Sequence, residues 1–231
     1  MNTYFSGQYY EDKSEIFRRQ LNRTYGIMAL GLTLTFVCAI LTAWLAPALI
    51  LSFPLAVILL VAQVITVVAF SATLHRAKFS TVLTMFVVYS ILTGISISYI
   101  FVLYDITNIF LCFAVTALCF AILAILGHST RRDLSGLGRY FLVGLIGLLV
   151  LSVVGVFLRS NLVDIIICCV GLVLFLGITA YDTQKLRQAA ENIPEGDEMS
   201  RKISVYFAMQ LYLDFVNIFL YVIRLFGRQR R

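Results

Sequence analysis

Long stretches without any charged side chain limit what this chain can fold into. Between Thr24 and His75 no residue carries a full charge at neutral pH. A helix needs about 20 apolar residues to cross roughly 30 Å of hydrocarbon, so this stretch is long enough for two crossings separated by a turn between Pro47 and Pro54. Because 61% of the 231 residues are hydrophobic and 13% are charged, the polar residues could not cover a soluble globule of this size. The sequence therefore predicts a membrane protein.

Similar windows recur along the rest of the chain and predict an all-α, polytopic domain with seven transmembrane helices. We expect this domain to cover residues 24–227, after a cytoplasmic N-terminal segment at 1–23 and before a basic tail at 228–231. The N-terminal segment is polar and contains Glu11, Asp12 and Glu15, which argues against a cleavable signal peptide or a mitochondrial presequence. The predicted spans are about 25–46, 50–73, 79–103, 106–127, 140–158, 162–181 and 203–225.

Lysine and arginine residues fall unevenly on the two sides of the predicted helices. With the N-terminus inside, the cytoplasmic face collects thirteen of them, from Lys13 to Lys202. The positive-inside rule then predicts a multi-pass plasma-membrane protein with a cytoplasmic N-terminus. The basic tail conflicts with this rule if all seven segments cross fully, whereas a re-entrant sixth or seventh segment would bring it inside. The net charge of +6 follows from this topology, and the scattered bases give no support to a nucleic-acid partner.

The last predicted span contains an isolated acid, Asp214, in an uncharged stretch from Ile203 to Ile223. A charge at mid-membrane costs at least roughly 2.5–3.5 kcal/mol, so such an acid is expected to face a polar interior and to serve a function. Steps of four and three residues place it on one helical face with other polar side chains, for which the alternative interpretation is interhelical hydrogen bonding alone. The members of this polar stripe are Gln210, Asp214, Asn217, Tyr221 and Arg224.

A second acid, Asp182, follows the apolar run of the sixth predicted span and precedes the polar segment Thr183–Gln184–Lys185. One interpretation is a solvated carboxylate at a helix end beside Lys185. The other is a pair with Asp214 in the adjacent antiparallel helix. Two carboxylates close together in a poorly hydrated site do not readily ionise together, so such a pair would share a proton.

Two runs resemble the signature segments of the bacterial branch of the Bax inhibitor family. They are Gly177–Ile178–Thr179–Ala180–Tyr181–Asp182–Thr183–Gln184–Lys185 and Leu211–Tyr212–Leu213–Asp214–Phe215–Val216–Asn217–Ile218–Phe219–Leu220. The resemblance implies seven helices with the C-terminal helix in the centre, and a pH-sensitive calcium leak in which Asp182 and Asp214 share a hydrogen bond. It also implies a basic latch on this pair, for which Arg76 and His75 are the nearest matches. A glutamate linked to the pore in relatives is replaced here by Gln63, so we expect ion selectivity or conductance to differ.

The sequence thus favours a pH-gated cation leak, chiefly for calcium, rather than an enzyme. Calcium is expected as a permeating ion, held weakly and transiently by Asp182 and Asp214 with help from Gln210, Asn217 and Tyr221, because tight binding needs six to eight oxygens. No organic cofactor is indicated. One alternative is a non-conducting regulator that binds a membrane protease or acts in a stress pathway. Another is an intramembrane aspartyl protease, although Leu211–Tyr212–Leu213–Asp214 lacks the glycines that would admit a substrate strand.

Overall fold

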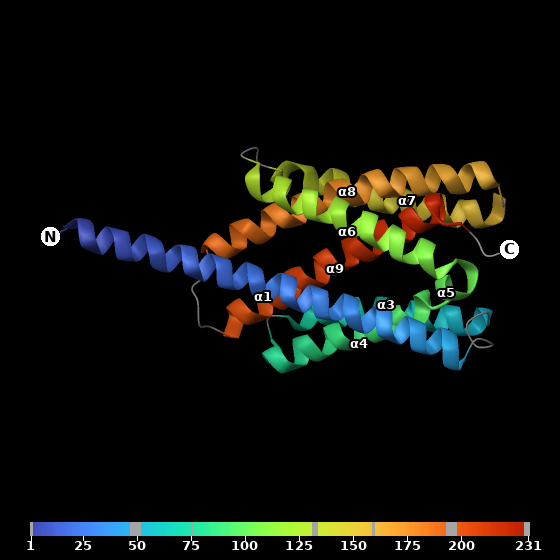
Figure 1. Cartoon of the computed structure of the whole chain (residues 1–231), viewed down its shortest axis with the longest axis horizontal. Coiled ribbons are helices and arrows are strands. Elements are labelled where there is room, and N and C mark those ends of the chain that lie inside the picture. The colour runs from blue at the N-terminus through green and yellow to red at the C-terminus, as the bar shows by residue number, and fades with distance from the viewer. Residues whose placement is uncertain are drawn as a thin grey trace. The chain divides into compact units, whose positions relative to one another are not determined.

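The structure, a computed structural model, is helical throughout its described parts, which contain no β-strand. Figure 1 shows the elements in chain order, from α1 in blue to α9 in red. They are α1 (Asn2–Leu45), α3 (Phe53–Thr73), α4 (Phe79–Ile97), α5 (Ile100–Leu103), α6 (Ile106–Ser129), the 3-10 helix η1 (Ser135–Leu137), α7 (Gly138–Leu158), α8 (Asn161–Asn192) and α9 (Glu198–Phe226). The described residues are 2–46, 52–74, 76–130, 134–158, 160–192 and 198–228, with the side chains of 2–14, 16 and 192 excluded.

Seven helical segments of the described chain are long and apolar enough to cross a membrane, which confirms the predicted number of spans. Their limits are Phe17–Leu45, Phe53–Thr73, Phe79–Leu103, Ile106–Ser129, Ser135–Leu158, Asn161–Glu191 and Glu198–Phe226. The largest difference from the sequence lies in the sixth span, because α8 continues past Tyr181 to Asn192. Asp182 therefore lies inside a helix, and the interpretation that places it at a helix end is wrong.

The chain divides into two compact units, and the first comprises residues 1–102 and 186–210. In this unit α4 packs against α1 and α3. A Cβ atom added to Gly94 would lie 2.6 Å from the carbonyl oxygen of Thr35, so only glycine permits this approach of α4 to α1. The Thr35 hydroxyl lies 2.9 Å from the carbonyl oxygen of Ser90 on the facing helix. A small residue and a buried hydroxyl thus join these helices. This is usual in membranes, where the hydrophobic effect does not drive helices together.

The first turn of α9 holds the α3–α4 turn in the same unit. The Phe79 backbone N–H donates to Glu198 Oε1 at 2.7 Å, and Lys202 Nζ donates to the Ala77 carbonyl oxygen at 3.2 Å. The Glu198 carboxylate thereby satisfies one of the unpaired N–H groups at the start of α4, where negative charge is stabilised by the helix dipole.

The second unit comprises residues 103–185 and 211–231, and it contains both predicted site acids. Aromatic rings join α6 to α9: Phe113 and Phe120 lie 5.2 and 5.7 Å from Phe215, centroid to centroid. Glycines let α8 approach its neighbours closely. A Cβ atom at Gly127 of α6 would lie 2.7 Å from the Ala180 carbonyl oxygen, and one at Gly171 of α8 would lie 2.5 Å from the Tyr221 ring.

Burial is distributed unevenly among the seven spans. In α9, 67% of the most apolar window is buried, whereas the other spans reach at most 39%. The fully buried side chains of α9 include Val205, Leu211, Tyr212 and Ile218. Most of the exposed large apolar side chains belong to the other helices, as expected for surfaces that face lipid.

Candidate functional site

Asp182 of α8 and Asp214 of α9 are both buried, with 7% and 3% of their surfaces exposed. They lie close enough for their charges to interact, and the Thr179 hydroxyl hydrogen-bonds to the Asp214 carboxyl group. The exposed position that a solvated Asp182 would need is not what the structure shows. The two acids that the sequence predicts to pair are therefore neighbours within the second unit.

Residues that come later in α9 contact residues that come earlier in α8. Asp214 is near Thr179 and Asp182, whereas the Tyr221 ring packs one to three turns earlier on α8, against Gly171 and against Phe175 at 6.0 Å. The helices are thus antiparallel in this unit. Neither is interrupted between its described ends, so the structure shows no re-entrant break of the kind that would return the C-terminus to the starting face.

Threonines extend the polar surface of α8 on both sides of Asp182. The Thr179 hydroxyl donates to the Phe175 carbonyl oxygen at 2.8 Å, and the Thr183 hydroxyl donates to the Thr179 carbonyl oxygen at 2.7 Å. A hydroxyl has one hydrogen and two acceptor positions, so Thr179 can accept from a protonated Asp214 or turn its hydrogen toward an ionised one. Among the described atoms, Asp214 Oδ2 is buried without a hydrogen-bond partner.

Lys185 is the basic residue whose charge acts on Asp182. It lies three residues further along α8, on the same helical face. Its Nζ atom is 4.5 Å from the centroid of the Tyr181 ring, which packs edge-on against Phe141 of α7. The lysine is therefore held near the carboxylate by a cation–π contact. Its positive charge lies close enough to interact with the Asp182 carboxyl group.

The two predicted latch residues cannot be compared with the acid pair in this structure. Arg76 is exposed in the turn after α3 and belongs to the first unit, and His75 is not among the described residues. Their role as a latch stays a prediction.

The two amide side chains of the polar stripe, Gln210 and Asn217, each donate a hydrogen bond within α9, whereas Gln210 Oε1 is buried without a partner among the described residues. Gln210 Nε2 donates to the Tyr206 hydroxyl at 2.9 Å, and Asn217 Nδ2 donates to the Leu213 carbonyl oxygen at 2.8 Å. Both bonds connect residues four apart. The structure therefore shows a use for each amide, and their part in an ion path stays a prediction.

Gln63 lies on α3 in the first unit and bonds to α4. Its Nε2 atom is 3.1 Å from Ser96 Oγ and 3.4 Å from Thr93 Oγ1. The side chain lines a largely apolar cavity of about 560 Å³ together with Thr42 and Tyr99. A neutral amide in such a cavity supplies one oxygen ligand and no charge, so it would hold a cation less strongly than a glutamate.

No group of three or more histidine, cysteine, aspartate or glutamate side chains gathers within the described part of the chain. The pair of carboxylates is thus far short of the six to eight oxygens of a tight calcium site.

Sequence reasoning missed three polar residues around the pair, Thr179, Thr183 and Gln184. Gln184 is buried, and its Oε1 atom accepts the Leu134 backbone N–H at 2.8 Å, which ties the segment before η1 to α8. The available signal was spacing: Thr179, Thr183, Leu186 and Ala190 recur every three or four residues, which indicates a continuing helix with one buried face.

The fold and this pair define an all-helical, seven-span membrane protein with two acids buried between adjacent helices. A family model described as "Inhibitor of apoptosis-promoting Bax1" matches residues 18–231. The chain belongs to the Bax inhibitor family, as the two signature runs predict.

Similar proteins extend over nearly the whole chain. Inner membrane protein YbhL of Escherichia coli strain K12 is 38% identical over 212 residues, which cover 90% of this chain and 91% of that protein. A protein of Rickettsia prowazekii is 37% identical over 218 residues, covering 94% and 92%, and one of Borreliella burgdorferi is 32% identical over 225 residues, covering 95% and 97%. Together with the seven apolar helices, the inner-membrane relative indicates a multi-pass protein of the bacterial plasma membrane.

Proposed function

We propose that this protein is a pH-sensitive cation leak, chiefly for calcium, gated by proton sharing between Asp182 and Asp214. The observation that carries the proposal is the burial of two interacting carboxyl groups on adjacent antiparallel helices. Family membership adds support, because the resemblance implies this activity for its bacterial members.

Proton sharing supplies the switch. When the pair holds a proton, the protonated carboxyl group can donate a hydrogen bond to a nearby acceptor. The two groups then carry at most one negative charge. When the proton leaves, two buried negative charges face each other, and their repulsion in a poorly hydrated site far exceeds its value in water. Separation of α8 from α9 then admits water and cations. The flux should accordingly rise as the pH rises.

Cation selectivity follows from the same groups. The ionised pair attracts a divalent cation, and the limited number of oxygens keeps the ion weakly bound, so it can leave on the other side. Lys185 tempers this attraction by interacting with Asp182.

Calcium flux into dye-loaded liposomes at pH 6 to 8 tests the proposal. The wild type should show a flux that rises with pH, and Asp182→Asn and Asp214→Asn should each abolish that rise, because neither variant can hold two charges. Asp105→Asn is the matched control, since Asp105 precedes α6 without a side-chain capping hydrogen bond and asparagine has a similar shape.

The other outcomes are distinct. A wild-type flux that ignores pH and both substitutions would overturn the leak and leave the non-conducting regulator. Cleavage of a membrane peptide that either substitution abolishes would replace the leak with the aspartyl protease.

A further inference from the structure

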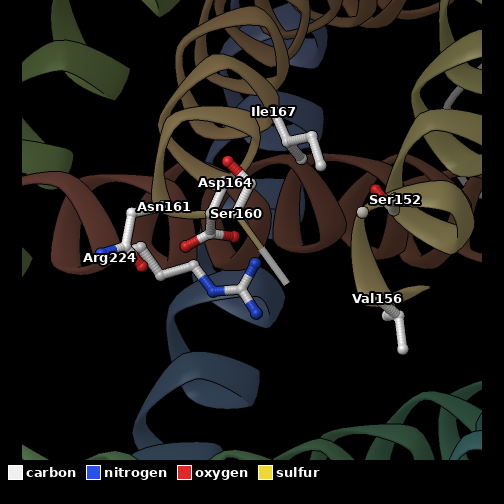
Figure 2. A pocket seen from close by; sticks show the side chains of 8 residues that line it. Ser152, Val156, Ser160, Asn161, Asp164, Ile167 and Arg224 are labelled. Carbon is white, nitrogen blue, oxygen red and sulfur yellow. The ribbon is translucent and has the colours of Figure 1, made fainter. Parts of the chain in front are cut away.

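A polar pocket of about 430 Å³ lies within the second unit, where α7 ends, α8 begins and α9 ends (Figure 2). It is distinct from the acid pair, because Asp164 precedes Asp182 by 18 residues of continuous helix, or roughly 27 Å along its axis. The residues that line the pocket are Ser152, Gly155, Val156, Ser160, Asn161, Asp164, Ile167 and Arg224.

Among the described residues that line it, the pocket presents one negative and one positive side chain. Asp164 comes from the first turn of α8 and Arg224 from the last turn of α9, and Figure 2 shows their polar ends in the same part of the pocket. Arg224 also contacts the Cys168 thiol one turn further along α8, which ties the guanidinium group to the helix that carries Asp164. Neutral donors and acceptors on Ser152, Ser160 and Asn161 complete the lining.

This arrangement selects the charge of a ligand. A simple cation would be opposed by Arg224 and a simple anion by Asp164, whereas a ligand with both charges satisfies both. The guanidinium group matches the oxygens of a phosphate in a bidentate geometry. A carboxylate with amide and hydroxyl oxygens nearby suits a primary ammonium group, which has three N–H donors. Quaternary ammonium groups are usually held by aromatic rings, and the lining residues that the structure describes include no aromatic ring.

The surroundings of the pocket indicate where such a ligand comes from. Large apolar side chains next to the lining are exposed: Phe157 by 81%, Val156 by 72% and Leu162 by 68%. These residues belong to the lipid-facing surface of helices that end here, so the pocket lies at the boundary between hydrocarbon and headgroups. A ligand with acyl chains would cover these side chains, and a soluble zwitterion would not.

We propose that this pocket binds the headgroup of a zwitterionic phospholipid with a primary amine, namely phosphoethanolamine. Arg224 binds the phosphate, Asp164 binds the ammonium group, and the acyl chains lie on the exposed apolar residues of α7 and α8. This lipid would fasten the end of α9 to the start of α8, at the opposite end of the helix pair from the gate.

Native mass spectrometry of the full-length protein in detergent tests the site, with phosphatidylethanolamine, phosphatidylcholine and phosphatidylglycerol added in turn. The wild type should retain phosphatidylethanolamine about tenfold better than the other two, as expected for one charge-assisted hydrogen bond. Asp164→Asn should lose this preference and retain phosphatidylglycerol better than the wild type does, because the carboxylate that repels an anionic lipid is gone. Arg224→Gln should weaken all three, and Arg224→Lys should restore part of the binding.

Two controls make the result specific. Asp105→Asn and Arg228→Gln change the same charges outside the pocket and should keep the wild-type preference. Circular dichroism shows whether each variant is folded, and a folded Arg224→Gln that retains lipid as the wild type does would overturn the proposal. Equal retention of the three lipids by the wild type would also overturn it. So would soluble phosphoethanolamine that binds as tightly as the lipid, since that result assigns the pocket to a soluble ligand.

Discussion

Helix α8 carries an aspartate at two positions, near its start and in its second half, in opposite settings. Asp182 is 7% exposed and interacts with a second carboxyl group, whereas Asp164 is exposed and shares a pocket with the guanidinium group of Arg224. A buried acid beside another acid makes its protonation state depend on its partner. The difference shows that two aspartates of one helix differ in burial and face side chains of opposite charge on α9.

Close packing around the acid pair also differs from close packing around the pocket. Near the acid pair, Gly127 of α6 faces a backbone carbonyl oxygen, that of Ala180, and the Cβ atom of Thr183. Near the pocket, Gly155 of α7 faces the Cδ1 atom of Ile167, which is the far end of a flexible side chain. The acid pair is therefore held by rigid backbone, and the pocket by side chains that can move.

The largest expected effect on stability comes from replacing these two glycines by alanine. Gly127→Ala should destabilise the protein by about 1–3 kcal/mol, because the new methyl group meets backbone that can yield only by moving a helix. Gly155→Ala should cost less than about 1 kcal/mol, since Ile167 can change its rotamer. The measurement is thermal unfolding in detergent for both variants. Equal losses of stability in the two variants would show that the acid pair and the pocket are equally rigid, which would contradict this part of the comparison.

A second prediction concerns the pH dependence of stability. If the folded acid pair keeps a proton that the unfolded chain releases, the native state binds more protons and stability falls as the pH rises, by up to about 1.4 kcal/mol per pH unit. The unfolding temperature of the wild type should then be lower at pH 8 than at pH 6. Asp182→Asn should reduce this difference, because one of the two carboxyl groups is gone while Asp214 stays buried, and Asp164→Asn should keep it. If only the Asp164 variant lost the difference, the retained proton would belong to Asp164 and not to the acid pair, and this prediction would be wrong.

The sequence was sufficient to predict the number of spans and to single out the two acids that lie near each other on α8 and α9. Charge-free windows have the length of a bilayer crossing, and the two signature runs contain Asp182 and Asp214. It was insufficient at the end of the sixth span, because Thr183, Gln184 and Lys185 have the composition of a loop. The structure buries two of these side chains and holds the third on an aromatic ring, so the helix continues.

Arg224 illustrates a different limit of the sequence. Its position in the polar stripe of the last span follows from helical periodicity. Its proximity to Asp164 depends on the antiparallel register of α8 and α9, which no local pattern specifies. The register is set by contacts such as Gly171 with Tyr221, where a missing side chain admits a large one.

The smallest expected effect separates two buried threonines that make the same backbone bond. Thr179 and Thr116 each donate to the carbonyl oxygen four residues earlier, at 2.8 Å, but only Thr179 also meets Asp214. Thr116→Val should be nearly neutral, because valine has a similar shape and the carbonyl keeps its helical hydrogen bond. Thr179→Val should lower stability by about 1 kcal/mol, because it leaves the Asp214 carboxyl group without this partner, and Thr179→Ser should restore most of it. Thermal unfolding at one fixed pH gives the three values. Equal effects of the two valine substitutions would mean that the Thr179 hydroxyl serves its own helix alone, and the acid pair would then depend on Asp182 and Lys185 for its environment.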